Sequence, residues 1–163
     1  MINTYDLFAT RVVHTKVPIP IDIHKKIISF VEDKYKEENT VSCIKGFQFH
    51  EDFNGKKELD HVLNAYLKNF LYIKIAYSWL NVLHNQSYNK PHSHNGTDVQ
   101  FAGVFYLSHE NNNIHFAKDS ETFEIKPKLF DLIVFPFHLL HYVLPEERVG
   151  KRICYAFNLE IIK

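Results

Sequence analysis

The stretch Arg152-Ile-Cys-Tyr-Ala-Phe-Asn-Leu-Glu-Ile161 alternates in the way of a β-strand. Every second side chain is bulky and apolar: Ile153, Tyr155, Phe157 and Leu159. The other face is small or polar: Arg152, Cys154, Ala156 and Asn158. Small residues beside one arginine leave room for a ligand, and a guanidinium binds a carboxylate through a bidentate fork. We therefore predict a strand with a core on one face and a ligand pocket on the other; Arg148, in the preceding loop, is the second candidate for the anion.

Further β-like stretches precede this strand at even spacing and are separated by polar turns. They cover residues 11–17, 41–49, 71–83, 99–107, 114–116, 122–125, 132–135 and 140–144. Residues 86–98 are expected to form a polar loop. Many short strands of this kind are typical of a sandwich or a barrel.

Two amphipathic segments lie ahead of most of these strands. Residues 22–36 have helical periodicity, with Asp22 as the expected N-cap, and residues 57–70 carry a second apolar stripe. Helices in this position would cover one of the sheets. We expect an α+β protein that is mainly β, with both helices packed on one sheet.

The length and the composition limit the class of protein. A chain of 163 residues is expected to form one domain, 1–163, with a helical support region at about 21–70 and a β core at about 71–163. The 19 basic and 19 acidic side chains balance, which argues against nucleic acid or an anionic membrane as the main partner. The two cysteines, Cys43 and Cys154, form no CxxC pair, and no signal sequence or membrane-length apolar run is present. We expect a soluble protein of a reducing cytoplasm.

Three of the 11 histidines stand in a pattern that suits a metal ion. His92 and His94 are two residues apart, so on an extended segment their imidazoles point the same way. His141 lies in an apolar run and could complete a facial set that leaves positions open for substrates. His138 competes with it, but His141 shares a strand face with Val143, whereas His138 falls at the entrance turn. Each histidine alone is explained as well by a polar loop or a satisfied core residue, so the prediction rests on their order.

Other residues point to a bound small molecule. Asn81 is an amide on the otherwise apolar face of its strand and needs a partner, which the backbone or a ligand could supply. Trp79 and Tyr88 are placed to stack on a substrate or to pack in the core. Asn158, on the small face of the last strand, is a third candidate for the substrate pocket.

Together these residues resemble the Fe(II)- and 2-oxoglutarate-dependent oxygenases, and in particular an uncharacterised 2OG-Fe(II) oxygenase family of bacteria and phages. The matching stretches run in family order from about residue 43 to the C-terminus. They are Gly46-Phe-Gln48, Ser78-Trp-Leu-Asn81-Val, Asn89-Lys-Pro-His92-Ser-His94, Gly103-Val-Phe-Tyr106-Leu, Phe135-Pro-Phe-His-Leu-Leu-His141-Tyr-Val and Arg152-Ile-Cys-Tyr-Ala-Phe-Asn158-Leu.

The resemblance implies a double-stranded β-helix, the jelly roll of cupin-like proteins. It implies that Fe(II) is held by three residues: His92, His94 and His141. Arg152 would pair with the distal carboxylate of 2-oxoglutarate, and Tyr106 and Asn81 would be further contacts of this cosubstrate. The implied reaction is hydroxylation of an unidentified substrate with release of succinate and CO2.

The chain departs from the superfamily at the metal and at the cosubstrate. An aspartate or glutamate usually stands where His94 stands, so a neutral third ligand would leave the site one charge more positive. Asp98, four residues on, could supply a carboxylate instead, although we favour His94. Cys154 and Ala156 stand where small hydroxyl residues are common, which removes hydrogen bonds that the cosubstrate could otherwise make.

Two other functions fit the same residues. A three-histidine dioxygenase of the cupin type would use O2 without 2-oxoglutarate, and Arg152 would then bind a substrate carboxylate. A non-catalytic jelly-roll module would use the pocket for recognition alone. We expect the substrate to be a small molecule or a protein side chain, and the Tyr- and Phe-rich edges would suit a homodimer as well as a core. The expected compartment is the cytoplasm of a bacterium, or of an infected host cell if the gene is carried by a phage.

Overall fold

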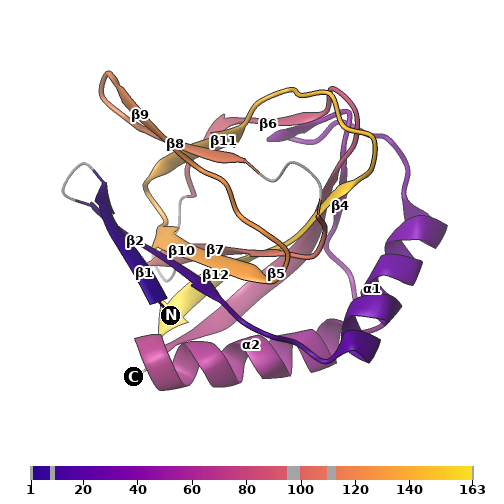
Figure 1. Cartoon of the computed structure of the whole chain (residues 1–163), viewed down its shortest axis with the longest axis horizontal. Helices are drawn as coiled ribbons and strands as arrows, with labels where there is room; N and C mark the ends of the chain where they lie inside the picture. The colour runs from indigo at the N-terminus through magenta and orange to yellow at the C-terminus, as the bar shows by residue number, and fades with distance from the viewer. Residues whose placement is uncertain (1, 8–9, 95–99, 110–112, 163) are drawn as a thin grey trace.

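The computed structural model describes residues 2–7, 10–94, 100–109 and 113–162, which form two antiparallel sheets and two helices (Figure 1). The larger sheet has the strand order β1-β2-β10-β7-β12-β5-β4, and the smaller sheet has the order β3-β6-β11-β8-β9. The larger sheet consists of β1 Ile2–Leu7, β2 Thr10–Lys16, β4 Phe47–Phe49, β5 Ile73–Leu83, β7 Phe101–Tyr106, β10 Asp131–Pro136 and β12 Arg152–Ile161. The smaller sheet consists of β3 Cys43–Ile44, β6 Tyr88–His92, β8 Ile114–Lys118, β9 Glu121–Ile125 and β11 Leu140–Val143. The mainly β, α+β architecture predicted from the strand spacing is confirmed.

The two faces of β12 have the different environments that its sequence predicts. This strand lies between β7 and β5 and pairs with β5 along its whole length. Its bulky side chains belong to the core beneath the helices: Ile153, Tyr155, Phe157 and Leu159. On the opposite face, Arg152, Cys154 and Ala156 line a cavity between the two sheets. The strand therefore forms a wall between the main core and this cavity.

The helices α1 (Ile21–Lys34) and α2 (Lys56–Leu71) pack on one face of the larger sheet, and α2 runs beneath this sheet in Figure 1. They bury one stripe each: Ile23, Ile27 and Val31 on α1, and Leu59, Leu63 and Leu67 on α2. The expected N-cap at Asp22 is wrong, because α1 begins one residue earlier, after Pro20, and Asp22 lies in the first turn. A carboxylate there still complements the positive end of the helix dipole. Neither of these helices is long and apolar enough to cross a membrane.

The expected loop at residues 86–98 is wrong for Tyr88–His92, which forms β6 between β3 and β11. His92 pairs with His141 of β11 and Asn89 pairs with Val143, so β6 has one residue more than β11 between these pairs. An extra residue of this kind is a β-bulge, and it accommodates Pro91, which cannot donate a ladder hydrogen bond. The bulge lets Asn89 and His92, three residues apart, both line the cavity. The structure also has a first strand, β1, in a region that we did not predict to be extended.

Gly103 of β7 has no side chain, and this leaves room for the ring of Phe157 on the core side of the sheet. A Cβ atom at this position would overlap the ring of Phe157, which is fully buried on the neighbouring strand β12. We expect Gly103→Ala to lower the free energy of unfolding by about 1–3 kcal/mol, because a packed ring must move. Chemical denaturation of the single and double variants measures this. The penalty should shrink in a Phe157→Leu background, and an equal penalty in both backgrounds would contradict the steric explanation.

Candidate metal and anion site

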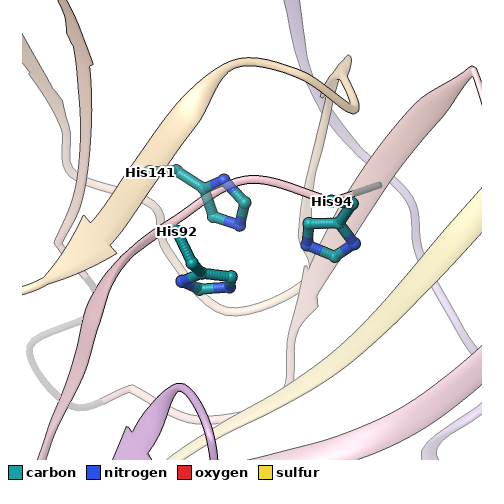
Figure 2. Close-up of side chains that lie close together, drawn as sticks. All are labelled: His92, His94 and His141. Carbon is teal, nitrogen blue, oxygen red and sulfur yellow. The ribbon is translucent and has the colours of Figure 1, made fainter. Parts of the chain in front are cut away.

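Three histidines meet at the junction of β6 and β11. His92 is the last residue of β6, His94 follows two residues later, and His141 lies opposite His92 on β11. The backbone N–H of His94 donates to the carbonyl of Phe137 at 2.9 Å, which anchors the segment after β6. One nitrogen from each ring lies within 4.8 Å of the others, close enough for one metal ion. Figure 2 shows the three imidazoles turned toward one another.

The hydrogen bonds of the three rings fix which nitrogen is free. The Nδ1 of His92 lies 2.7 Å from the Lys90 carbonyl oxygen, and that of His141 lies 2.9 Å from the Leu139 carbonyl oxygen. The Nδ1 of His94 lies 2.6 Å from the side-chain oxygen of Asn158. Oxygens of these kinds only accept, so each Nδ1 donates its proton. The lone pair of each neutral ring is then on Nε2, the form in which histidine binds metal ions.

The surroundings keep these histidines neutral. Burial is the main cause that lowers the pKa of His92 and His94. The pKa of His141 lies well below its usual value, first because of burial and then because of the neighbouring His92. Neutral imidazoles are ligands for a cation, whereas protonated ones would repel it.

The cavity beside the histidines contains a buried cation. Arg152 is 2% exposed and lines the cavity, and no described residue forms an ion pair with it. Its Nε has no hydrogen-bond partner among the described residues. The guanidinium lies over the ring of Tyr106, 5.3 Å from the centroid, which compensates only part of the cost of burying a charge. An anion from outside the protein would complete this arrangement.

Arg148 is also buried but has a different environment. Its guanidinium donates to the carbonyl oxygens of His84, Ser87 and Leu144, at 3.0–3.4 Å. These contacts tie together the two loops that flank the end of the smaller sheet. Arg148 therefore has a structural role, and Arg152 is the arginine that faces the cavity.

Several other polar atoms near Arg152 are buried without a partner among the described residues. They are the Tyr106 hydroxyl, the Asn81 Oδ1 and the Asn89 Nδ2. The two amides bond to each other across the sheets, Asn81 Nδ2 to Asn89 Oδ1 at 3.3 Å, and both line the cavity. Burial raises the pKa of Tyr106 far above its usual value, so its hydroxyl remains a donor. Buried polar atoms are almost always paired in native proteins, so this cluster indicates a polar ligand.

The structure brings most of the predicted residues together. His92, His94, His141, Arg152, Asn81 and Trp79 all line the one cavity. His138 is exposed in the turn before β11, away from this lining. Burial raises the pKa of the lining residue Cys154 to about 11, so its thiol is protonated at neutral pH, and Cys154 is not part of the histidine cluster.

Four predictions have other outcomes. Tyr106, predicted to contact the cosubstrate, is fully buried against Arg152 and is not among the residues that line the cavity. Asn158 accepts a hydrogen bond from His94 through its Oδ1 and is not among the residues that line the cavity, so its contact with a substrate stays a prediction. Tyr88, predicted at the pocket mouth, is half-buried on β6 and is not among the residues that line the cavity. Asp98, the alternative metal ligand, lies outside the described residues. Sequence reasoning missed Asn89 as a cavity residue, since nothing in a supposed polar loop distinguished one asparagine from its neighbours.

Known structures share this fold. The Pseudomonas putida prolyl-4-hydroxylase matches with a TM-score of 0.68 and 12% identity over 96% of this chain and 95% of that chain. A 2OG-Fe(II) oxygenase family oxidoreductase from Burkholderia pseudomallei matches with a TM-score of 0.61 and 12% identity, over 90% of this chain and 84% of that chain. HygX from Streptomyces hygroscopicus, whose structure contains nickel and 2-oxoglutarate, matches with a TM-score of 0.69 and 10% identity over 92% and 82%. No protein-family model and no curated protein sequence matches the chain.

These matches establish the fold of the chain. At such low identity they carry no residue roles with them, and the fold they share is that of the 2OG-Fe(II) oxygenases, the double-stranded β-helix. The fold implied by the sequence resemblance is thus confirmed. The narrower bacterial and phage family remains a prediction.

The two buried arginines should respond in opposite ways to removal of their charge. We expect Arg148→Met to lower the free energy of unfolding by about 1–3 kcal/mol, because several buried carbonyls lose their donor. Arg152→Met should leave the stability of the ligand-free protein unchanged or raise it, because an unpaired buried charge disappears. Denaturant titration of the metal-free proteins measures both. A loss in Arg152→Met as large as that in Arg148→Met would mean that Arg152 has a structural partner.

Proposed function

We propose that this protein is an Fe(II)- and 2-oxoglutarate-dependent dioxygenase that hydroxylates its substrate. The observation that carries the proposal is one cavity with three neutral histidines at one place and an unpaired buried arginine at another. The three histidines are ligands for a metal ion, and the arginine would bind the far carboxylate of a dicarboxylate that is also bound to the metal. The fold shared with 2OG-Fe(II) oxygenases supports the same proposal.

The residues present fit both groups. His92, His94 and His141 would hold the iron through Nε2, because their Nδ1 atoms are bonded elsewhere. Arg152 would bind the distal carboxylate of 2-oxoglutarate, and the Tyr106 hydroxyl offers a second donor beside it. When bound, the iron and 2-oxoglutarate together supply the oxidation of a C–H bond by O2, with release of succinate and CO2.

The chain itself orients the metal-binding imidazoles and offers polar partners to the bound molecules. The carbonyls of Lys90 and Leu139 and the amide of Asn158 hold the imidazoles in one tautomer. The cross-sheet pair of Asn81 and Asn89 presents one acceptor and one donor to the cavity. A reducing cytoplasm, which we propose as the compartment, would keep the iron ferrous and the two buried cysteines free.

Binding of the metal can be followed through a single fluorophore. Trp79 is the one tryptophan in the sequence, and its ring centroid lies 6.0 Å from that of His94. We expect Ni(II) to quench its emission with one ion per chain, because a nearby transition-metal ion deactivates the excited indole. Alanine at His92, His94 or His141 should weaken binding by at least about tenfold, since each removes one of three ligands.

Two variants serve as controls for this metal titration. His138→Ala removes an exposed histidine close in sequence to His141 and should leave the affinity unchanged. Asp98→Asn should also bind normally if His94 is the third ligand. Loss of metal in Asp98→Asn with retention in His94→Ala would assign the third position to the carboxylate. Normal binding in all three histidine variants would contradict the metal site.

Recognition of the distal carboxylate can be measured by thermal unfolding of the Ni(II)-loaded protein. A saturating ligand stabilises by RT ln(1 + [L]/Kd), about 2.7 kcal/mol at one hundred times Kd. We expect 2-oxoglutarate to raise the Tm more than 2-oxobutyrate, which lacks the distal carboxylate. Arg152→Met should still bind Ni(II) but should no longer distinguish the two acids. If the wild-type protein binds Ni(II) and neither acid shifts its Tm, a three-histidine dioxygenase without 2-oxoglutarate becomes the better explanation.

A further inference from the structure

An aromatic cluster lies at the side of the cavity next to His94. Tyr77 and Trp79 are two residues apart on β5 and share one face with Asn81. Along this face the exposed fraction falls from 49% at Tyr77 to 9% at Asn81, and Trp79 is half-buried between them. This face of β5 therefore leads from solvent into the cavity.

His50, directly after β4, completes the cluster. Its ring centroid lies 5.8 Å from that of Tyr77 and 5.7 Å from that of Trp79, with interplanar angles of 20° and 18°. Its Nδ1 lies 2.8 Å from the Tyr77 hydroxyl, and this hydrogen bond fixes both rings. The rings of Tyr77 and Trp79 are 5.7 Å apart. The His50 ring is nearly parallel to both of the others, whereas the rings of Tyr77 and Trp79 are tilted by 34° to each other. The three rings are thus held in place before any ligand arrives, which lowers the entropy lost on binding.

The cluster is connected to the candidate metal site through Trp79. The indole lines the cavity, and its plane lies 30° from that of His94. Its Nε1 is buried and has no hydrogen-bond partner among the described residues, so one N–H donor remains for a ligand. A flat ring held against Trp79 would therefore lie close to His94, one of the three candidate metal ligands.

We propose that His50, Tyr77 and Trp79, here named the aromatic platform, bind a planar aromatic ring of the substrate. Aromatic rings prefer offset or edge contacts at centroid distances of roughly 4.5–7 Å, so a flat ligand ring would extend the contacts that these three rings already make with one another. The free indole N–H selects a ring with a hydrogen-bond acceptor beside it. This inference rests on the proposed function, because a substrate held here places an aliphatic carbon attached to its ring at the metal. The substrate class is therefore a small aromatic molecule that carries an acceptor and an alkyl substituent.

The platform can be tested in the metal-free protein with two matched probes. Benzamide and cyclohexanecarboxamide share the carboxamide acceptor and the six-membered ring, and only the first is flat. We expect ligand-observed NMR titrations to show benzamide binding roughly threefold to tenfold more tightly. This preference should disappear in Trp79→Leu and weaken in Tyr77→Leu. Equal affinity of the two probes for the wild-type protein would overturn the platform.

A matched control variant shows whether benzamide binds at the aromatic platform or at any exposed aromatic side chain. Phe70 of α2 is 56% exposed and lies outside the cavity lining, so Phe70→Leu should keep the full preference for benzamide. Loss of the preference in Phe70→Leu as well would place the ring elsewhere and overturn the proposal. Thermal unfolding of each variant confirms that it is folded.

A separate experiment measures how close the bound benzamide ring lies to the metal ion. In Mn(II)-loaded protein, the ring protons of benzamide should relax faster, and this effect should vanish in His141→Ala, which retains the platform. Bound Mn(II) without any effect on bound benzamide would overturn the placement beside the metal. If Mn(II) does not bind, the metal site of the proposed function fails, whereas the probes in the metal-free protein still decide whether the platform binds a flat ring.

Discussion

A buried cation without a protein anion is the constraint on which the site depends. Arg152 is almost completely removed from water, and the described residues offer it the face of Tyr106 but no carboxylate. Desolvation of a charge is expensive, and a ring face repays only part of that cost. The unpaired atoms of Asn81 and Asn89 in the same cavity, and that of Tyr106 beside Arg152, add to the cost. A ligand that pairs with the Arg152 charge and with these polar atoms would offset this cost. The site is therefore organised to bind a polar, anionic ligand.

The stability needed to hold this cavity open comes from the other face of the same strand. Tyr155, the neighbour of Cys154 on β12, points into the core beneath α2. Its hydroxyl donates to Asp60 at 2.6 Å and lies within hydrogen-bond distance of Ser78 and of Lys56, which is also on α2. This network ties the helix to β5 and β12 directly behind the cavity wall. The alternation of β12 thus places the stabilising contacts and the binding contacts on opposite sides of one backbone.

The sequence predicted what depends on local periodicity. The alternation at 152–161 and the stripes of the two helices specify which face of each element is buried, and the spacing of His92 and His94 specifies a shared direction. Strand β6 could not be predicted in this way, because Tyr-Asn-Lys-Pro-His is polar and owes its extended form to pairing with β11, which follows some fifty residues later. The bulge at Pro91 and the inward position of Asn89 follow from that pairing. The contact of Asn158 with His94 joins β12 to the segment that follows β6, residues far apart in the sequence, so no local pattern could indicate it.

The most direct test of the central claim is an anaerobic titration of the Fe(II)-loaded protein with 2-oxoglutarate, followed by visible absorbance. A cosubstrate bound to iron should give a weak metal-to-ligand charge-transfer band that saturates at one equivalent. The band should be absent in His141→Ala and should require a higher 2-oxoglutarate concentration in Arg152→Met. A protein that binds one Fe(II) per chain and develops no band at any 2-oxoglutarate concentration would contradict the assignment of both the cosubstrate and its arginine.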